Sequence, residues 1–373
     1  MKKLAAALAV SAVLISGLQT AGAGPTQGGF ASDNVEFVRQ VPFDVGTATG
    51  AKVIGKYLYV TSWRAFSIYD LSDPLDPQLL STTPFGFKFE NEDVSTNGSI
   101  LVFSETLPQS NLHIWDVENK TNPTALATLA GAGQHTMSCI LKCKYLYGSG
   151  GSIIDLRDPA NPKVVGSWGE GMPATSAHDV NEVAPGLVLT SSRPVMLLDA
   201  RKDPLHSKLL AVGDDERITG GVHSNTWPRA ARDKFFMLSS ETNFQGRCSG
   251  ANGAFMTWDA SQYRKTKTFR MIDIFQLDNG TYQDGNPAVQ ASGCSAHWFE
   301  HHPDFHNGGV VAVGSYDHGT RFLEVSPKGK ISQAGYFLPY GGTTMASYWL
   351  DDEIVYGIDL SRGIDILRYR GAA

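Results

Sequence analysis

The feature that most constrains the fold is a short apolar run ending in aspartate that recurs along the chain. Its four clearest copies read SIYD, HIWD, SIID and LLD, and they end at Asp70, Asp116, Asp155 and Asp199. Successive copies are 46, 39 and 44 residues apart. Each run is too short for a helix and is rich in apolar residues, which favours a strand. The chain is therefore expected to fold as a series of similar strand-based units.

The stretch 176–200 shows what one unit contains. It holds three apolar segments, DVNEV, LVLTSS and VMLLDA, separated by turn residues. A fourth apolar segment follows the aspartate in the first copy, as PQLLSTTPF. Four strands recurring about every 40 to 50 residues predict an all-β, seven-bladed β-propeller. The last unit, 343–370, lacks a fourth strand, and we expect residues 35–41 to supply it and close the ring.

The N-terminus predicts export of the protein. Lys2 and Lys3 precede an apolar segment and the small-residue sequence AGA at 21–23, which is typical of a Sec-type signal peptide over residues 1–23. Residues 24–373 would then form one propeller domain that is secreted or periplasmic. The net charge of −6 and the lack of a basic stripe argue against nucleic acid as a partner. No later apolar stretch is long enough for a membrane span, so we expect no membrane partner. We also expect the protein to be a monomer.

The fifth unit is irregular and contains two of the four cysteines. We predict insertions at about 243–255 and 278–293, which would cover one end of the ring. Export permits disulfides, and we favour Cys139–Cys143 across a hairpin turn and Cys248–Cys294 closing the long insertion. The sequence alone leaves all three pairings of four cysteines open. Thiolate metal ligation is less favoured, because the chain has no CxxC pair.

Histidine recurs at one position of the opening strands, which line the channel of a propeller. The aligned segments are ENEDV, QHTMS, AHDVN, VHSNT and AHWFE, which place Glu92, His135, His178, His223 and His297 at equivalent positions. The steps between them are 43, 43, 45 and 74 residues, the last enlarged by the insertions. Equivalent residues form a ring, so four imidazoles and one carboxylate should converge on the axis. The alternative is a structural ring of four histidines that bond only backbone groups and water. It is less favoured, because mutual repulsion would keep the imidazoles neutral without using their lone pairs.

Four imidazoles suit a transition metal better than calcium or magnesium. Three histidines and a water are the usual catalytic zinc set, whereas a fourth histidine with open positions fits copper or iron better. We therefore expect one transition metal ion, copper or iron, with zinc and manganese as alternatives. The histidines of HWFEHHPDFHNGG beyond His297 lie on a turn, and we interpret them as a polar surface turn.

A second set of polar residues lies where second strands turn into third strands. These residues would surround a substrate near the metal as a polar bowl. Arginines here can clamp an anionic or carbonyl group, and carboxylates or histidine can move protons. With Glu92, the candidates for catalytic roles are Arg64, Glu105, Arg193, Glu241 and His318, and Tyr316 and Arg362 occupy the same ring.

The third-strand segments SIYDL, HIWDV, SIIDL and MLLDA resemble the LVIVD-repeat propellers over most of residues 50–370. The arrangement of the four histidines is similar to that of the carotenoid-cleaving oxygenases, which hold iron by four histidines on a seven-bladed propeller axis. It also resembles the selenium-binding (methanethiol oxidase) family of copper propellers. The first resemblance implies the architecture alone, and the other two imply a metal-dependent oxidoreductase.

Three functions are therefore open. The first is a secreted metalloenzyme with a mononuclear tetra-histidine centre that oxidises a small molecule with copper or iron. The second is a metal-assisted lyase or hydrolase, similar to propeller polysaccharide lyases, that acts on a saccharide. The third is a non-catalytic scaffold in which the metal stabilises the ring. Dependence on dioxygen separates the first function from the second.

Overall fold

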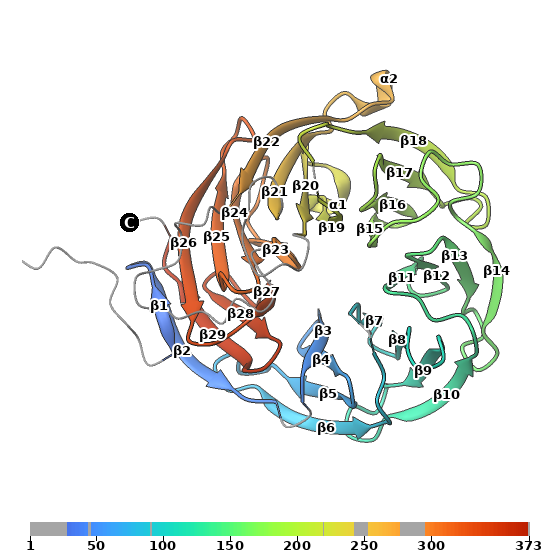
Figure 1. The fold of residues 1–373 in the computed structure, drawn as a ribbon, viewed down its shortest axis with the longest axis horizontal. Helices are drawn as coiled ribbons and strands as arrows, with labels where there is room; N and C mark the ends of the chain where they lie inside the picture. The colour runs from blue at the N-terminus through green and yellow to red at the C-terminus, as the bar shows by residue number, and fades with distance from the viewer. Residues whose placement is uncertain are drawn as a thin grey trace, which may run out of the picture.

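Seven β-sheets surround a central axis as the blades of a propeller in the computed structural model (Figure 1). The structure describes residues 28–43, 46–89, 92–218, 220–241, 253–276 and 295–371. Within each blade the strands are antiparallel and follow one another outward from the axis. The predicted all-β, seven-bladed fold is therefore confirmed. The proposed signal peptide and the pairing of Cys248 with Cys294 lie outside the described residues.

The first four blades follow the repeat that the sequence shows. Blade one comprises β3 (Ala48–Ile54), β4 (Tyr57–Ser62), β5 (Ala65–Asp70) and β6 (Gln78–Pro84). Blade two comprises β7 (Ser95–Thr96), β8 (Ile100–Ser104), β9 (Leu112–Asp116) and β10 (Thr124–Leu129). Blade three comprises β11 (Met137–Ile140), β12 (Tyr145–Gly148), β13 (Ser152–Asp155) and β14 (Lys163–Ser167). Blade four comprises β15 (Val180–Ala184), β16 (Leu187–Thr190), β17 (Val195–Asp199) and β18 (Lys208–Gly213).

The last three blades include the irregular parts of the chain. Blade five comprises β19 (Val222–Thr226), β20 (Phe235–Ser240), β21 (Ala254–Asp259) and β22 (Arg270–Gln276), with short helices α1 (Pro228–Ala231) and α2 (Tyr263–Thr266) in its turns. Blade six comprises β23 (Phe299–His301), β24 (Gly309–Gly314), β25 (Thr320–Val325), β26 (Ile331–Pro339) and β1 (Gly29–Ala31). Blade seven comprises β27 (Thr344–Trp349), β28 (Ile354–Asp359), β29 (Gly363–Tyr369) and β2 (Val35–Val41). No helix among the described residues is long and apolar enough to span a bilayer.

The N-terminal segment closes the ring by pairing with the last blades. β2 pairs antiparallel with β29, as predicted, so the outer edge of blade seven is covered. β1 pairs antiparallel with β26 of blade six. A Cβ at Gly29 would lie 2.1 Å from the carbonyl oxygen of Leu338, so glycine permits this close pairing.

The core lies between neighbouring blades rather than inside any one of them. In β17, Leu197 packs in one cluster with Phe236 and Trp258 of blade five. Its neighbours Met196 and Leu198 belong to a cluster that includes Tyr147 of blade three. Successive side chains of a strand point to opposite faces of its sheet, so one strand joins both adjacent blades. This packing fixes the inner strands around the channel.

The two faces of the ring carry different turns. We call the face with the turns between second and third strands the upper face, and the opposite one the lower face. Inner strands run from the upper to the lower face, so residues just before them lie at the upper mouth of the channel. The predicted disulfide is present and joins Cys139 of β11 to Cys143 in the lower-face turn that follows. The predicted insertion at 243–255 ends earlier than expected, because β21 begins at Ala254, and the one at 278–293 lies outside the described residues.

Candidate metal centre

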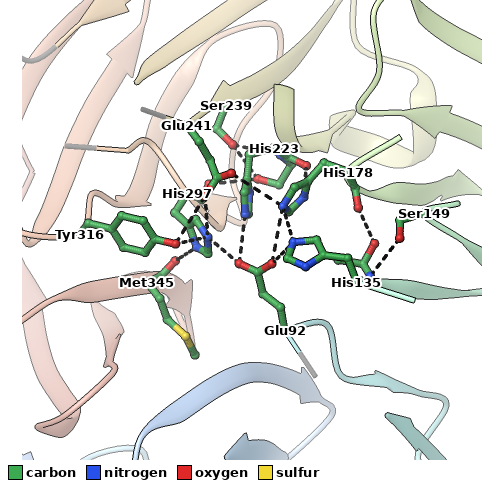
Figure 2. A network of polar contacts seen from close by, with 12 residues as sticks. Glu92, His135, Ser149, His178, His223, Ser239, Glu241, His297, Tyr316 and Met345 are labelled. Carbon is green, nitrogen blue, oxygen red and sulfur yellow. Dashed lines mark hydrogen bonds and ion pairs between the residues drawn. The ribbon is translucent and has the colours of Figure 1, made fainter. Parts of the chain in front are cut away.

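Five consecutive blades place one side chain each at the upper mouth of the channel. Glu92, His135, His178 and His297 lie just before inner strands β7, β11, β15 and β23, and His223 is the second residue of β19. Their side chains point toward one another, with the Glu92 carboxylate facing the four imidazoles (Figure 2). The common position in the repeat explains this convergence, because equivalent residues of a propeller meet around its axis.

The four imidazoles approach the carboxylate through the same ring nitrogen. The Nε2 atoms of His135, His178, His223 and His297 lie 2.6, 3.5, 3.3 and 2.6 Å from the nearest Glu92 oxygen. The Nε2 atoms of His135 and His178 are 2.7 Å apart. Two groups have ligand atoms within 4.8 Å of one another, namely Glu92, His178 and His223, and His223, Glu241 and His297. Nitrogen and carboxylate donors at this spacing can hold one metal ion.

Backbone carbonyls fix the orientation of two of these rings. The Nδ1 atom of His178 lies 3.1 Å from the carbonyl oxygen of His223, and that of His297 lies 2.7 Å from the carbonyl oxygen of Met345. A carbonyl only accepts hydrogen bonds, so Nδ1 carries the proton and Nε2 keeps its lone pair when the ring is neutral. This second contact is the one that metal-binding histidines commonly make. It directs the Nε2 lone pair of each ring into the centre.

Burial shapes the charge of the cluster. It lowers the pKa of His178 to about 3, against the opposing effect of Glu92, and His135 and His297 lower it further. Burial also holds the pKa of His223 well below its ordinary value. Burial alone would raise the pKa of Glu92, but the surrounding histidines hold it well below its ordinary value. The centre therefore combines an anionic carboxylate at Glu92 with neutral imidazoles at His178 and His223.

An anionic carboxylate facing nitrogen lone pairs is unfavourable unless a positive charge lies between them. A shared proton would satisfy one Nε2–carboxylate contact at a time, whereas one metal cation would satisfy several. The donors match the ligands that transition metals prefer. The residues present therefore fit a bound transition metal ion.

Two members of the second polar ring reach the histidines. Glu241 follows β20, and its carboxylate oxygens lie 3.9 Å from Nε2 of His178 and 3.7 Å from Nε2 of His297. The Tyr316 hydroxyl lies 2.8 Å from Nε2 of His297 and 3.5 Å from Glu241 (Figure 2). Burial raises the pKa of Glu241, with His297 opposing and Glu92 adding to the rise.

The backbone at Tyr316 is strained. Its φ of 44° lies in the left-handed region, which is unfavourable for a bulky side chain. Such strain persists only where the surrounding structure fixes it, and it is often found at functional sites. Tyr316 is fixed on both sides, since its backbone N–H and carbonyl both bond Thr344.

The other candidates make contacts of their own. Glu105 is fully buried between the Lys88 ammonium at 2.7 Å and His113 Nε2 at 2.8 Å. Arg193 contacts Asp214 at 3.0 Å and the carbonyl oxygen of Ile218, which ties it to the loop after β18.

The remaining three candidates differ in exposure and pairing. Arg362 pairs with Asp365 at 2.8 Å, and Arg64 is exposed on the upper face. His318 is fully buried, which lowers its pKa to about 3. Arg193 and Arg362 thus already bind groups of the protein itself, and the predicted clamp and proton-transfer roles stay predictions.

Sequence reasoning missed a polar cavity in the channel just below the ring. The cavity has a volume of about 280 Å³, and its lining includes Lys52, Asp93, Ser138, Asp179 and Glu300. The Ser138 hydroxyl lies 3.3 Å from Asp93 and 3.2 Å from Asp179. Burial raises the pKa of Asp93 to about 6 and the pKa of Asp179 to about 8. The signal was present, because each aspartate directly follows a ring residue in ENEDV and AHDVN.

Comparisons with known proteins support the repeat and the architecture. Residues 45–83 match the family model described as the LVIVD repeat. No curated protein sequence matches the chain. Among solved structures, the crystal structure of RRP9 WD40 repeats is similar with a TM-score of 0.58 and 11% identity, over 92% of this chain and 99% of that one. At this identity the likeness concerns the fold alone: the chain is a seven-bladed propeller whose first blade matches the LVIVD-repeat model.

Proposed function

We propose that the protein is an exported metalloenzyme with a mononuclear histidine centre, and that it oxidises a small molecule with copper or iron. The observation that carries the proposal is the convergence of four Nε2 atoms, two of them with Nδ1 held by a backbone carbonyl. Histidines 135, 178, 223 and 297 would hold the metal, with Glu92 as a further ligand or counter-charge. The bound metal would supply one-electron redox chemistry and a site for a small oxidant.

The protein's own groups would orient and protect the reacting molecule. The Tyr316 hydroxyl contacts Nε2 of His297 at 2.8 Å, and it would donate a hydrogen bond to a bound molecule once that nitrogen ligates the metal. Glu241 lies between His178 and His297 and can accept a proton there. The packed blades exclude water from the far sides of His223 and His297, which are 0% and 1% exposed.

The test compares two histidines in apoprotein loaded with Cu(II) and freed of loose metal by gel filtration. His178→Ala removes a proposed ligand, whereas His206→Ala removes an exposed histidine that contacts Asp203 at 2.9 Å. We expect nitrogen hyperfine structure in the electron paramagnetic resonance spectrum and dioxygen uptake with ascorbate for the wild type and His206→Ala. His178→Ala should lose most of both signals. Equal copper content and equal dioxygen uptake in the two variants would contradict the proposal.

A metal-assisted lyase or hydrolase is the second candidate. The observation in its favour is Glu241, a partly buried carboxylate with a raised pKa beside two of the histidines, which suits a general base. Such an enzyme would cleave a saccharide under argon as fast as under air, whereas the oxidoreductase would stop. Chelation that lowers the melting temperature of a protein with no turnover on either class of substrate would instead favour the scaffold.

A further inference from the structure

The lower face of blade five departs from the repeat in two turns at once. The turns between third and fourth strands of blades one to four each carry at least one carboxylate, at Asp73, Glu118, Asp158 and Asp203. The corresponding turn of blade five, 260–269, has none and instead contains Arg264, Lys265 and Lys267. The equivalent turn of blade six, 326–330, also lacks a carboxylate but has two lysines, so blade five carries the largest number of cations in such a turn.

The turn between the first and second strands of blade five is also unusual. It spans residues 227–234, whereas the equivalent turns range from two residues in blades one and four to seven in blade six, at 302–308. It adds Arg229, Arg232 and Lys234. Its backbone is strained, because φ is 53°, 52° and 63° at the three successive residues 229–231. Three non-glycine residues in this conformation are unfavourable and persist only where the surrounding contacts fix them.

The contacts that fix this turn also bind its carboxylate. Asp233 is 3% exposed and accepts the backbone N–H of Asn307 at 2.9 Å. His306 Nδ1 lies 3.1 Å from the same carboxylate, and the Arg229 side chain 3.7 Å. The indole N–H of Trp227 bonds the carbonyl oxygen of Asp233 at 2.6 Å. The Asp233 carboxylate is therefore already bonded by Asn307 and His306 of blade six and lies near the Arg229 cation.

The two turns enclose a cavity of about 460 Å³ on the lower face, with α2 at the outer rim of the ring beside β18 and β22 (Figure 1). Trp227 and Tyr263 line it as aromatic walls, and Asp233 is the one carboxylate in its lining. The cationic lining residues are Arg232, Lys234, Arg264 and Lys265. The guanidinium of Arg264 stands over the Tyr263 ring at 5.1 Å, and Lys234 donates to the carbonyl oxygen of Pro327.

Among the described residues, the cations of this cavity lack a carboxylate partner, unlike two arginines of other lower-face turns. Arg157 and Arg201 bind the aspartate two residues before them, in each case at 2.5 Å. Within the described part of the chain, Arg232 and Lys265 have no ion pair. The protein as a whole carries a net charge of −6, so this local excess of positive charge does not follow from composition.

We infer that this cavity binds a phosphate or sulfate monoester, at a site on the face opposite the histidine ring. A guanidinium can bind two oxygens of such a group at once, and an ammonium adds a compact charge. Ser261, Gln262 and Asn307 supply neutral hydrogen-bonding groups in the same lining, and the aromatic walls can pack against the organic part of the ester. The volume lies in the range of small-molecule sites.

The test is a calorimetric titration of the full chain with phenyl phosphate, and with benzyl alcohol as the uncharged comparison. Arg232→Gln with Lys265→Gln removes two cations of the cavity, whereas Arg157→Gln with Lys163→Gln removes the same charge from the lower face of blade three. We expect the first pair to weaken phenyl phosphate binding by about tenfold or more, and the second to change it little. All four side chains are exposed, and matched melting temperatures check the folding of both variants.

A second arm separates the two sources of this chemistry. Phosphatidylcholine vesicles with and without phosphatidic acid test a lipid headgroup, whereas phenyl phosphate in solution tests a free ester. Binding to either probe that the cavity variant loses and the control keeps supports the site. Absence of binding to both, or an equal loss in both variants, overturns it. All titrations are repeated in chelator, because binding at this site should not depend on a metal in the histidine ring.

Discussion

Replacing Glu300 with glutamine should stabilise the protein at alkaline pH. Glu300 lies on β23 in the wall of the cavity below the histidine ring, and its carboxylate accepts the backbone N–H of Trp349 at 2.8 Å. Burial raises its pKa to about 7, while the hydrogen bond from Trp349 and the charge of Lys52 oppose the rise. Glutamine keeps an oxygen that can accept the N–H but has no charge to bury.

The size and sign of the effect follow from this pKa. Between pH 4.5 and about 7 the folded protein holds a proton at Glu300 that the unfolded chain has lost. The free energy of unfolding of the wild type therefore decreases as pH rises through this window. Above it, the full difference corresponds to about 3 kcal/mol, and because Glu300 is only partly buried we expect an effect of about 1–3 kcal/mol.

Urea unfolding followed by tryptophan fluorescence at several pH values from 5 to 8.5 measures the effect. We expect Glu300→Gln and the wild type to be similar near pH 5, and the variant to have the higher midpoint at pH 8. Glu170→Gln, at an exposed position after β14, is the control and should change little at any pH. A pH-independent difference, or a wild type more stable than the variant at pH 8, would refute the reasoning.

Two further predictions concern the ring itself. Replacing Cys139 and Cys143 with serine should lower the free energy of unfolding by only about 2 kcal/mol, because the bridge closes a very short loop. Urea unfolding measures this change, and a loss as large as that of a long-loop disulfide would contradict the prediction. Asn34→Ala removes the amide contacts to the carbonyl oxygens of Ala334 and Gly371, at 2.9 and 2.7 Å, that join blades six and seven. It should lower stability by about 1–2 kcal/mol and expose the N-terminal strands to limited proteolysis, whereas Asn119→Ala, on an exposed turn of blade two, should do neither.

The repeat made the architecture predictable from sequence. A strand ending in aspartate every 40 to 50 residues is visible without knowledge of any contact, and closure by 35–41 follows from the strand missing in the last unit. β1 was not predictable in this way. Its pairing with β26 uses backbone groups and the small size of Gly29, and neither leaves an apolar pattern in the sequence.

The same contrast holds for the candidate site. The period places Glu92 and the four histidines at one level, because each occupies the same position in its blade. The period does not predict where the long side chains between the second and third strands point, because their direction depends on local partners. Arg193 turns toward Asp214 and Arg362 toward Asp365, while Glu241 and Tyr316 reach His297. The cavity around Asp93 and Asp179 became visible only when the blades were assembled.

The metal content of the protein tests the central claim most directly. The protein would be produced in medium supplemented with copper, iron, zinc and manganese, purified without chelators and measured by plasma mass spectrometry. The convergence of the four Nε2 atoms predicts one transition metal ion per chain in the wild type and in His206→Ala, and a large loss in His178→Ala and His297→Ala. Only traces of metal in the wild type, or the same content in all four proteins, would contradict the account.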